Sequence, residues 1–156
     1  MTVLIDNMLR QSSASVTTWV AGIENHPNYL VNSTVFEEPE LSEKAKILSQ
    51  KLDEFRLLAP DWDSYGADVP DISVIHQAKH LIERLDHMKF PIFFVVPGPN
   101  GEISIELKKD GVSSEIILGE DGEMELLISK NNKLISEKQP ADEEALISEL
   151  QVTFTT

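Results

Sequence analysis

A series of short alternating segments, separated by turn residues, constrains the fold of this 156-residue chain more than any other feature. Apolar and polar residues alternate from Ile103 to Lys108, a period of two that is typical of a strand with one buried face. The stretches Asp110-Gly111 and Glu120-Asp121-Gly122 then favour tight turns. The pattern predicts consecutive antiparallel strands, a β-meander, over residues 103–108, 112–118 and 123–129.

Further strands and three helices complete the predicted fold. A continuous apolar run over residues 92–96 is short enough to be a buried strand, and residues 133–137 follow the turn signal Asn131-Asn132. Apolar residues with helical spacing predict amphipathic helices over residues 42–58 and from the N-cap Asp71 onward, and a closing helix over residues 141–150. We expect an α+β fold in which two amphipathic helices pack on an antiparallel β-meander with a C-terminal helix.

Residues 1–40 differ from the rest of the chain because they show no sustained periodicity and contain clusters of Ser, Thr and Asn. We interpret them as an irregular N-terminal segment and residues 41–156 as the α+β domain, the two together forming one compact domain. A chain of this length buries roughly two-thirds of its unfolded surface on folding. Its core therefore needs no disulfide or metal for stability.

Composition excludes several classes of function. The chain has no cysteine, which removes disulfides, thiolate metal sites and cysteine nucleophiles and favours a reducing compartment, the cytoplasm. Its formal net charge of −14 argues against direct binding of nucleic-acid phosphates. No apolar run approaches the roughly 20 residues of a membrane span, so no membrane partner is expected. Residues 101–156 hold 13 of the 27 acidic residues, and an acidic surface of this kind suits a basic protein partner.

One stretch carries a family resemblance. Trp62-Asp63-Ser64-Tyr65-Gly66-Ala67 is followed by a predicted helix, then by Pro97, Asn100-Gly101 and the alternating strand that begins at Ile103. This arrangement resembles a group of small, uncharacterised bacterial and phage proteins of mobile elements that share a Trp-Asp-Gly-x-Gly-Ala turn, a helix and a Pro-x-x-Asp/Asn-Gly hairpin. The likeness covers about residues 55–150, with Ser64 in place of a Gly. It implies the fold and a bacterial or phage setting, and it implies no catalytic residue.

Our leading functional hypothesis is a non-catalytic module that neutralises or masks a basic protein partner, such as a toxin, nuclease or defence enzyme. It would act as an antitoxin, an immunity protein or an anti-defence inhibitor. The aromatic side chains of the turn either pack over the following helix or serve as exposed anchors. We expect no cofactor, because the sequence lacks the nucleophile elbow, the phosphate-binding Gly-rich loop and the His-Glu-x-x-His pair. The predicted partner-binding residues are Trp62, Tyr65, Glu115, Glu120, Glu123 and Glu125.

Two alternatives stay open at this point. His76, His80 and Glu83 share one stripe of the second predicted helix, which predicts a solvent-facing zinc or nickel site in an enzyme, or a metal or pH sensor. In the other alternative the chain is a self-assembling structural component or a homodimer, in which apolar strand residues at an exposed sheet edge pair with a second copy. The residues expected at such an edge are Ile103, Ile105 and Leu107, or Ile116 and Leu118.

Overall fold

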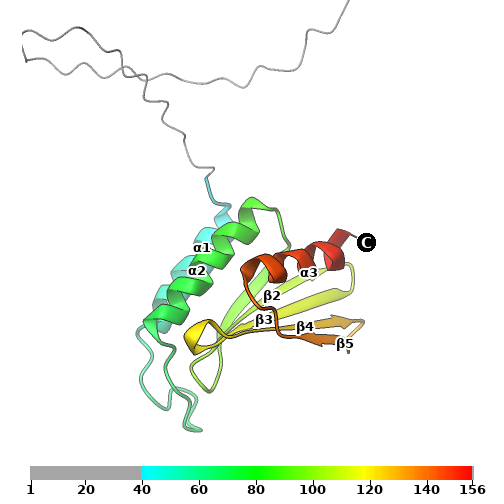
Figure 1. The fold of residues 1–156 in the computed structure, drawn as a ribbon. Coiled ribbons are helices and arrows are strands. Elements are labelled where there is room, and N and C mark those ends of the chain that lie inside the picture. Colours follow the sequence, from blue (N-terminus) through cyan, green and yellow to red (C-terminus); the bar gives the residue numbers. More distant parts are fainter. Residues whose placement is uncertain (1–39, 156) are drawn as a thin grey trace, which may run out of the picture. The chain divides into compact units, whose positions relative to one another are not determined.

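The computed structural model describes residues 40–155 (Figure 1). All but the last residue of the predicted irregular segment, residues 1–40, lie outside the described residues. The helices are α1 (Glu43–Phe55), α2 (Ile72–His87) and α3 (Glu143–Thr155), and a short 3-10 turn, η1, spans Glu120–Gly122. The strands are β1 (Ile92–Pro97), β2 (Ile103–Lys109), β3 (Val112–Leu118), β4 (Met124–Lys130) and β5 (Lys133–Lys138). Across residues 40–155, every helix is too short or too polar to cross a membrane.

The strands form one sheet in chain order, β1-β2-β3-β4-β5, and every neighbouring pair is antiparallel. The predicted α+β fold, with a meander and a C-terminal helix, is confirmed. Two of the turns have left-handed backbone at both central residues: φ is 51° at Asp110 and 79° at Gly111, and 51° at Asn131 and 62° at Asn132. Turns of this type match the twist of the flanking strands, which is why these dipeptides indicate hairpins.

Side-chain caps fix where the first two helices begin. The Ser42 hydroxyl accepts the amide of Ala45 at the start of α1, and the Asp71 carboxylate accepts the amide of Ser73 at the start of α2. The end of α1 was predicted three residues too late. The amides of residues 56–58 bond to carbonyls three residues back, so the chain leaves the α-helix through a tighter turn.

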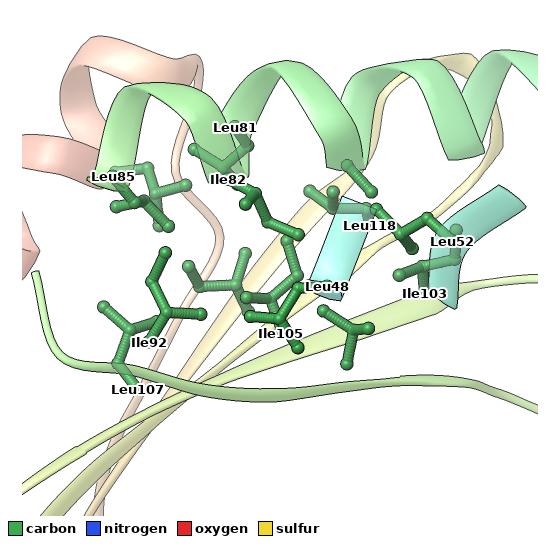
Figure 2. Close-up of a cluster of buried hydrophobic side chains, with 14 of the residues drawn as sticks. Leu48, Leu52, Leu81, Ile82, Leu85, Ile92, Ile103, Ile105, Leu107 and Leu118 are labelled. Carbon is green, nitrogen blue, oxygen red and sulfur yellow. The ribbon is translucent and has the colours of Figure 1, made fainter. Parts of the chain in front are cut away.

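All three helices lie on one face of the sheet (Figure 1). Figure 2 shows α2 side chains such as Leu85 pointing toward strand residues such as Ile105 and Leu107. At the β5 edge, Lys138 forms an ion pair with Glu149 of α3. Lys138 lies opposite Leu126, which is buried in the core, so α3 covers the same face of the sheet as α2. The opposite face of the sheet has no helix over it within residues 40–155.

The expectation that five apolar strand residues lie at an exposed edge is wrong. Those five are Ile103, Ile105, Leu107, Ile116 and Leu118. They belong to β2 and β3, which are interior strands, and each is 0% exposed. The edges are β1 and β5, and each carries one extra residue, Phe93 and Ile135, where the register shifts. Such bulges twist an edge strand and hinder pairing with another chain.

Asp86, near the end of α2, holds the start of α1. Its Oδ2 accepts the Ser42 amide at 2.8 Å, and its Oδ1 accepts the Ser42 hydroxyl at 2.5 Å. Burial raises the pKa of Asp86, but the hydrogen bonds from Ser42 outweigh that effect, so its pKa lies below the ordinary value. The carboxylate is therefore ionised at neutral pH and joins the two helices.

We expect Asp86→Ala to lower the free energy of unfolding by about 2 kcal/mol at pH 7, because the Ser42 amide and hydroxyl lose their partner. The folded-state pKa is depressed, so this stability is present above about pH 4 and is lost as the pH falls through the folded-state value. Urea unfolding between pH 7 and pH 2 measures both effects. Asp53→Ala removes an exposed ion pair with Lys79 and should change stability little. If the difference in free energy of unfolding between wild type and Asp86→Ala is as large at pH 2 as at pH 7, the ionised Asp86 carboxylate is not its source.

Ser114 of β3 gives a second stability prediction. Its side chain is 0% exposed, it lies between Leu107 and Ile128 on the helix-covered face, and its hydroxyl has no hydrogen-bond partner among residues 40–155. A buried hydroxyl without a partner is unfavourable, so Ser114→Ala should raise the free energy of unfolding by about 1 kcal/mol. Urea unfolding is the measurement, with Ser113→Ala on the opposite face as the control. A destabilised Ser114→Ala variant would show that the hydroxyl is satisfied in the protein.

Candidate functional site

The sheet face opposite the helices is the candidate functional site, and we call it the open face. Its residues follow from the register, because paired residues on neighbouring strands point to the same side and side chains alternate along each strand. One row across the sheet contains Phe94, Glu106, Glu115, Leu127 and Glu137. The next row contains Val96, Ser104, Ile117 and Glu125.

Apolar and acidic side chains share the open face. Phe94, Val96, Ile117 and Leu127 are only half-buried, so carbon surface remains for contact. Within residues 40–155 none of the four glutamates of these rows forms an ion pair with Lys, Arg or His. Apolar surface interspersed with unpaired carboxylates suits a ligand that offers both cationic and apolar groups.

Two of the carboxylates oppose each other at the centre of the open face. The register places Glu106 of β2 directly opposite Glu115 of β3. Side chains in this relation have Cβ atoms about 5 Å apart, and like charges there are destabilising. The sheet therefore retains concentrated negative charge at a cost to its own stability. Local conflicts of this kind are expected where a surface is used for binding.

We expect Glu115→Gln to raise the free energy of unfolding by about 0.5 kcal/mol at low ionic strength, because it removes the repulsion from Glu106. Salt screens this repulsion, so the gain should shrink in 1 M NaCl. Urea unfolding at the two salt concentrations measures the difference. Glu54→Gln, on the exposed side of α1, is the matched control for loss of one negative charge. Equal gains in both variants would attribute the effect to net charge alone.

The predicted aromatic turn is held by its own carboxylates. Asp61 Oδ1 accepts the amide of Gly66 at 2.7 Å. Asp63 Oδ1 accepts the amides of Tyr65 at 2.8 Å and Ala67 at 3.1 Å. Backbone φ is positive at Asp61 and Gly66, at 65° and 93°, a conformation that these local bonds stabilise. The turn is thus a fixed structure that presents its remaining side chains in defined directions.

The two aromatic residues of this turn have different surroundings. Trp62 is half-buried, and its indole N–H donates to the Asp68 carbonyl at 3.1 Å, so it stabilises the turn. Tyr65 is 93% exposed, and of the two expectations for it the structure shows the exposed one. A fully exposed tyrosine on a rigid turn suits contact with another protein, because the ring loses little conformational freedom on binding.

The six predicted partner-binding residues fall into two groups, one on the open face and one in the turns at one end of the sheet. Glu115 and Glu125 lie on the open face. Glu120 and Glu123 are exposed at the β3–β4 turn. The aromatic turn with Trp62 and Tyr65 lies at the same end of the sheet, because Asp68 within it bridges to Asn100 of the β1–β2 turn (Figure 1). These turns therefore lie at one end of the sheet, where the β3–β4 turn also lies close to α2.

Seven residues of the open face were missed in the sequence, namely Phe94, Val96, Ser104, Glu106, Ile117, Leu127 and Glu137. The alternation in residues 103–108 already assigned Glu106 to the exposed side, but its partner across the hairpin was not considered. Comparison with known proteins adds no assignment, since no protein-family model, no curated protein and no solved structure matches this chain. The functional argument therefore depends on the open face and the end turns.

The histidine stripe is exposed on α2, as expected, but the structure does not support it as a metal site. Among residues 40–155, no three His, Cys, Asp or Glu side chains are placed to hold a metal ion. His80 Nδ1 instead lies 3.5 Å from a carboxylate oxygen of Glu143 on α3, and Arg84 donates to the other oxygen at 2.9 Å. His76 and Glu83 lie exposed along the same helix. Within residues 40–155, the contacts of His80 and Arg84 with Glu143 join α2 to α3.

Proposed function

We propose that this protein is a non-catalytic binding module whose open face masks a basic protein partner, in the manner of an antitoxin, an immunity protein or an anti-defence inhibitor. The observation that carries the proposal is the opposed pair Glu106 and Glu115, which forms no ion pair within residues 40–155 and has half-buried apolar side chains next to it. A partner that brings arginine or lysine to this pair would relieve its repulsion.

A basic protein fits this surface better than other ligands. Two copies of the chain stacked through their open faces would bring the central glutamate pairs of both copies together, which is unfavourable for four like charges. Nucleic acid would be repelled by the net charge of −14. Arginine side chains can bind carboxylates in a two-pronged geometry while their methylene groups cover apolar surface. This combination matches the mixed acidic and apolar character of the open face.

The partner is proposed to dock on the face of the sheet rather than to extend it by another strand. Both edge strands carry a bulge, at Phe93 and Ile135, that interrupts the regular backbone pattern needed for strand addition. Tyr65 and the acidic β3–β4 turn are exposed at one end of the sheet and would contact a partner that extends past that end. The proposal includes a cytoplasmic location, which the absence of cysteine favours.

The test begins with a pull-down of the tagged protein from its native host at physiological salt, followed by mass spectrometry. We expect one stoichiometric basic partner that high salt releases. Kinetics with that partner then map the surface: Glu106→Gln/Glu115→Gln should slow association about tenfold and flatten its salt dependence. Leu127→Asp should mainly speed dissociation, because it removes apolar contact near the centre of the face. Tyr65→Ala should weaken binding without a change in stability, since the ring is exposed.

A matched control separates the open face from net charge. Glu54→Gln/Glu83→Gln removes two negative charges from exposed helix positions and should leave the association rate within about twofold of wild type. If this control slows association as much as the open-face pair does, the partner senses only overall charge. If neither pair has an effect, the partner binds elsewhere and the proposed surface is wrong.

A further inference from the structure

A hollow lined by lysines lies beside the start of β1, and it contrasts with the acidity of the chain. It has a volume of about 350 Å³, and Lys44 of α1, Lys89 of the α2–β1 loop and Lys108 of β2 contribute to its wall. A second hollow of about 380 Å³ shares Lys89, Phe90 and Pro91 with the first and adds Lys109. We call the first of these the lysine hollow.

The three lysines of the lysine hollow form no ion pair with another side chain of residues 40–155. Within residues 40–155, Lys44, Lys89 and Lys108 form no ion pair, whereas four basic residues elsewhere are paired: Lys46, Lys79, Arg84 and Lys138. One carboxylate lines the lysine hollow, that of Asp86, and both of its oxygens already accept hydrogen bonds from Ser42. Three positive charges from three different elements therefore face one negative charge, that of Asp86, on one concave surface, which leaves a net excess of two positive charges.

An aromatic ring positions two of these ammonium groups. The Nζ atoms of Lys44 and Lys108 each lie over the Phe93 ring, 5.4 Å from its centroid. A cation in this position is attracted to the ring face, which favours a defined placement of each side chain. Phe93 is the extra residue of the β1 bulge and is 48% exposed, so the bulge brings the ring to the surface between the two lysines.

Lys89 occupies a backbone position that favours glycine. The Phe90 amide bonds to the Leu85 carbonyl and the Lys89 amide bonds to the Asp86 carbonyl, which is the usual hydrogen-bond pattern at a helix end that closes through a left-handed residue. Lys89 is that residue, with φ of 63°. Glycine adopts this conformation without steric cost. A lysine here adds a positive charge to the hollow at some cost to backbone stability.

We propose that the lysine hollow binds a small, multivalent phosphate-bearing ligand. Lysine ammonium groups act as point charges that suit phosphate, and several of them around one hollow favour an anion with more than one negative charge. The volume is at the lower end of the range for small-molecule sites. Charges more than about 8 Å apart are screened at physiological salt. The lysines of the hollow therefore determine the electrostatic attraction of a small ligand, and the distant acidic residues contribute little. A long polyanion or an anionic membrane would also meet the acidic remainder of the protein.

The test uses the whole chain and soluble probes: pyrophosphate, tripolyphosphate and ATP, each titrated by calorimetry and by amide NMR. We expect one-to-one binding that strengthens with phosphate number and weakens with salt. Lys44→Gln and Lys108→Gln should each lower affinity about tenfold. Lys89→Gly should lower affinity by a similar factor while raising the melting temperature, because glycine suits the left-handed backbone. That variant separates loss of binding from loss of folding.

Matched controls and competing ligands complete the test. Lys130→Gln/Lys133→Gln removes two exposed lysines from the β4–β5 hairpin and should leave affinity within about twofold. Absence of binding by all three phosphate probes, or equal losses in the control pair, would overturn the proposal. So would stronger binding to an acidic peptide, to single-stranded DNA or to vesicles that contain phosphoinositides than to soluble tripolyphosphate. The lysine hollow adjoins the open face, because Lys108 lies two residues from Glu106 on β2 and the ring of Phe93 contacts that of Phe94. Lys44 and Lys89 belong to other elements, so phosphate binding by their variants is a test separate from protein binding by the glutamate pair.

Discussion

Side chains alternate between the two sides of every strand, and in this sheet α1, α2 and α3 cover only one side. Ile105 and Leu107 therefore point into the core while Glu106, between them, points away from it. A shift of one residue in the pairing would bury the carboxylates and expose the leucines, so the core fixes the register and the register fixes the open face. The contact of Ser42 with Asp86 joins α1 to the end of α2 within the layer that covers the apolar side.

The centre of the proposed site could have been predicted in full from the sequence. A two-residue turn at Asp110-Gly111 places Lys109 opposite Val112, and counting back along both strands places Glu106 opposite Glu115, as the structure shows. The alternating pattern then assigns both glutamates to the side away from the core. Hairpin geometry is local, so its consequences extend reliably along two regular strands.

The margins of the site depend on features that a sequence pattern does not locate. Counting from the turn at Asn131-Asn132 would place Glu137 opposite Leu126, on the core side. The extra residue Ile135 shifts the register so that Glu137 lies opposite Leu127 instead. A bulge depends on how the edge strand curves around the helices, which is a tertiary property. The exposure of Tyr65 was one of two alternatives in the sequence, and it is found on a turn that the Asp61 and Asp63 carboxylates hold by local hydrogen bonds.

The lysine hollow shows a different limit of sequence reasoning. Its lysines are separated by up to 64 positions in the chain, from Lys44 to Lys108, and no spacing rule connects them. They meet because the start of α1, the end of α2 and the first hairpin lie together at one corner of the sheet. A net charge of −14 describes the average surface and conceals a local region of opposite sign.

The order of strands in the sheet also bears on how the chain folds. Each strand pairs with the one made just before it, so every step of sheet formation closes a short loop and loses little chain entropy. The helices α1 and α2 precede all five strands in the chain, so the residues that cover the apolar side are synthesised before the first hairpin. The ties between helices span 44 residues for Ser42 and Asp86 and 59 residues for Arg84 and Glu143. Of these elements α3 is synthesised last, so its contacts with the sheet can form only after all five strands have been made.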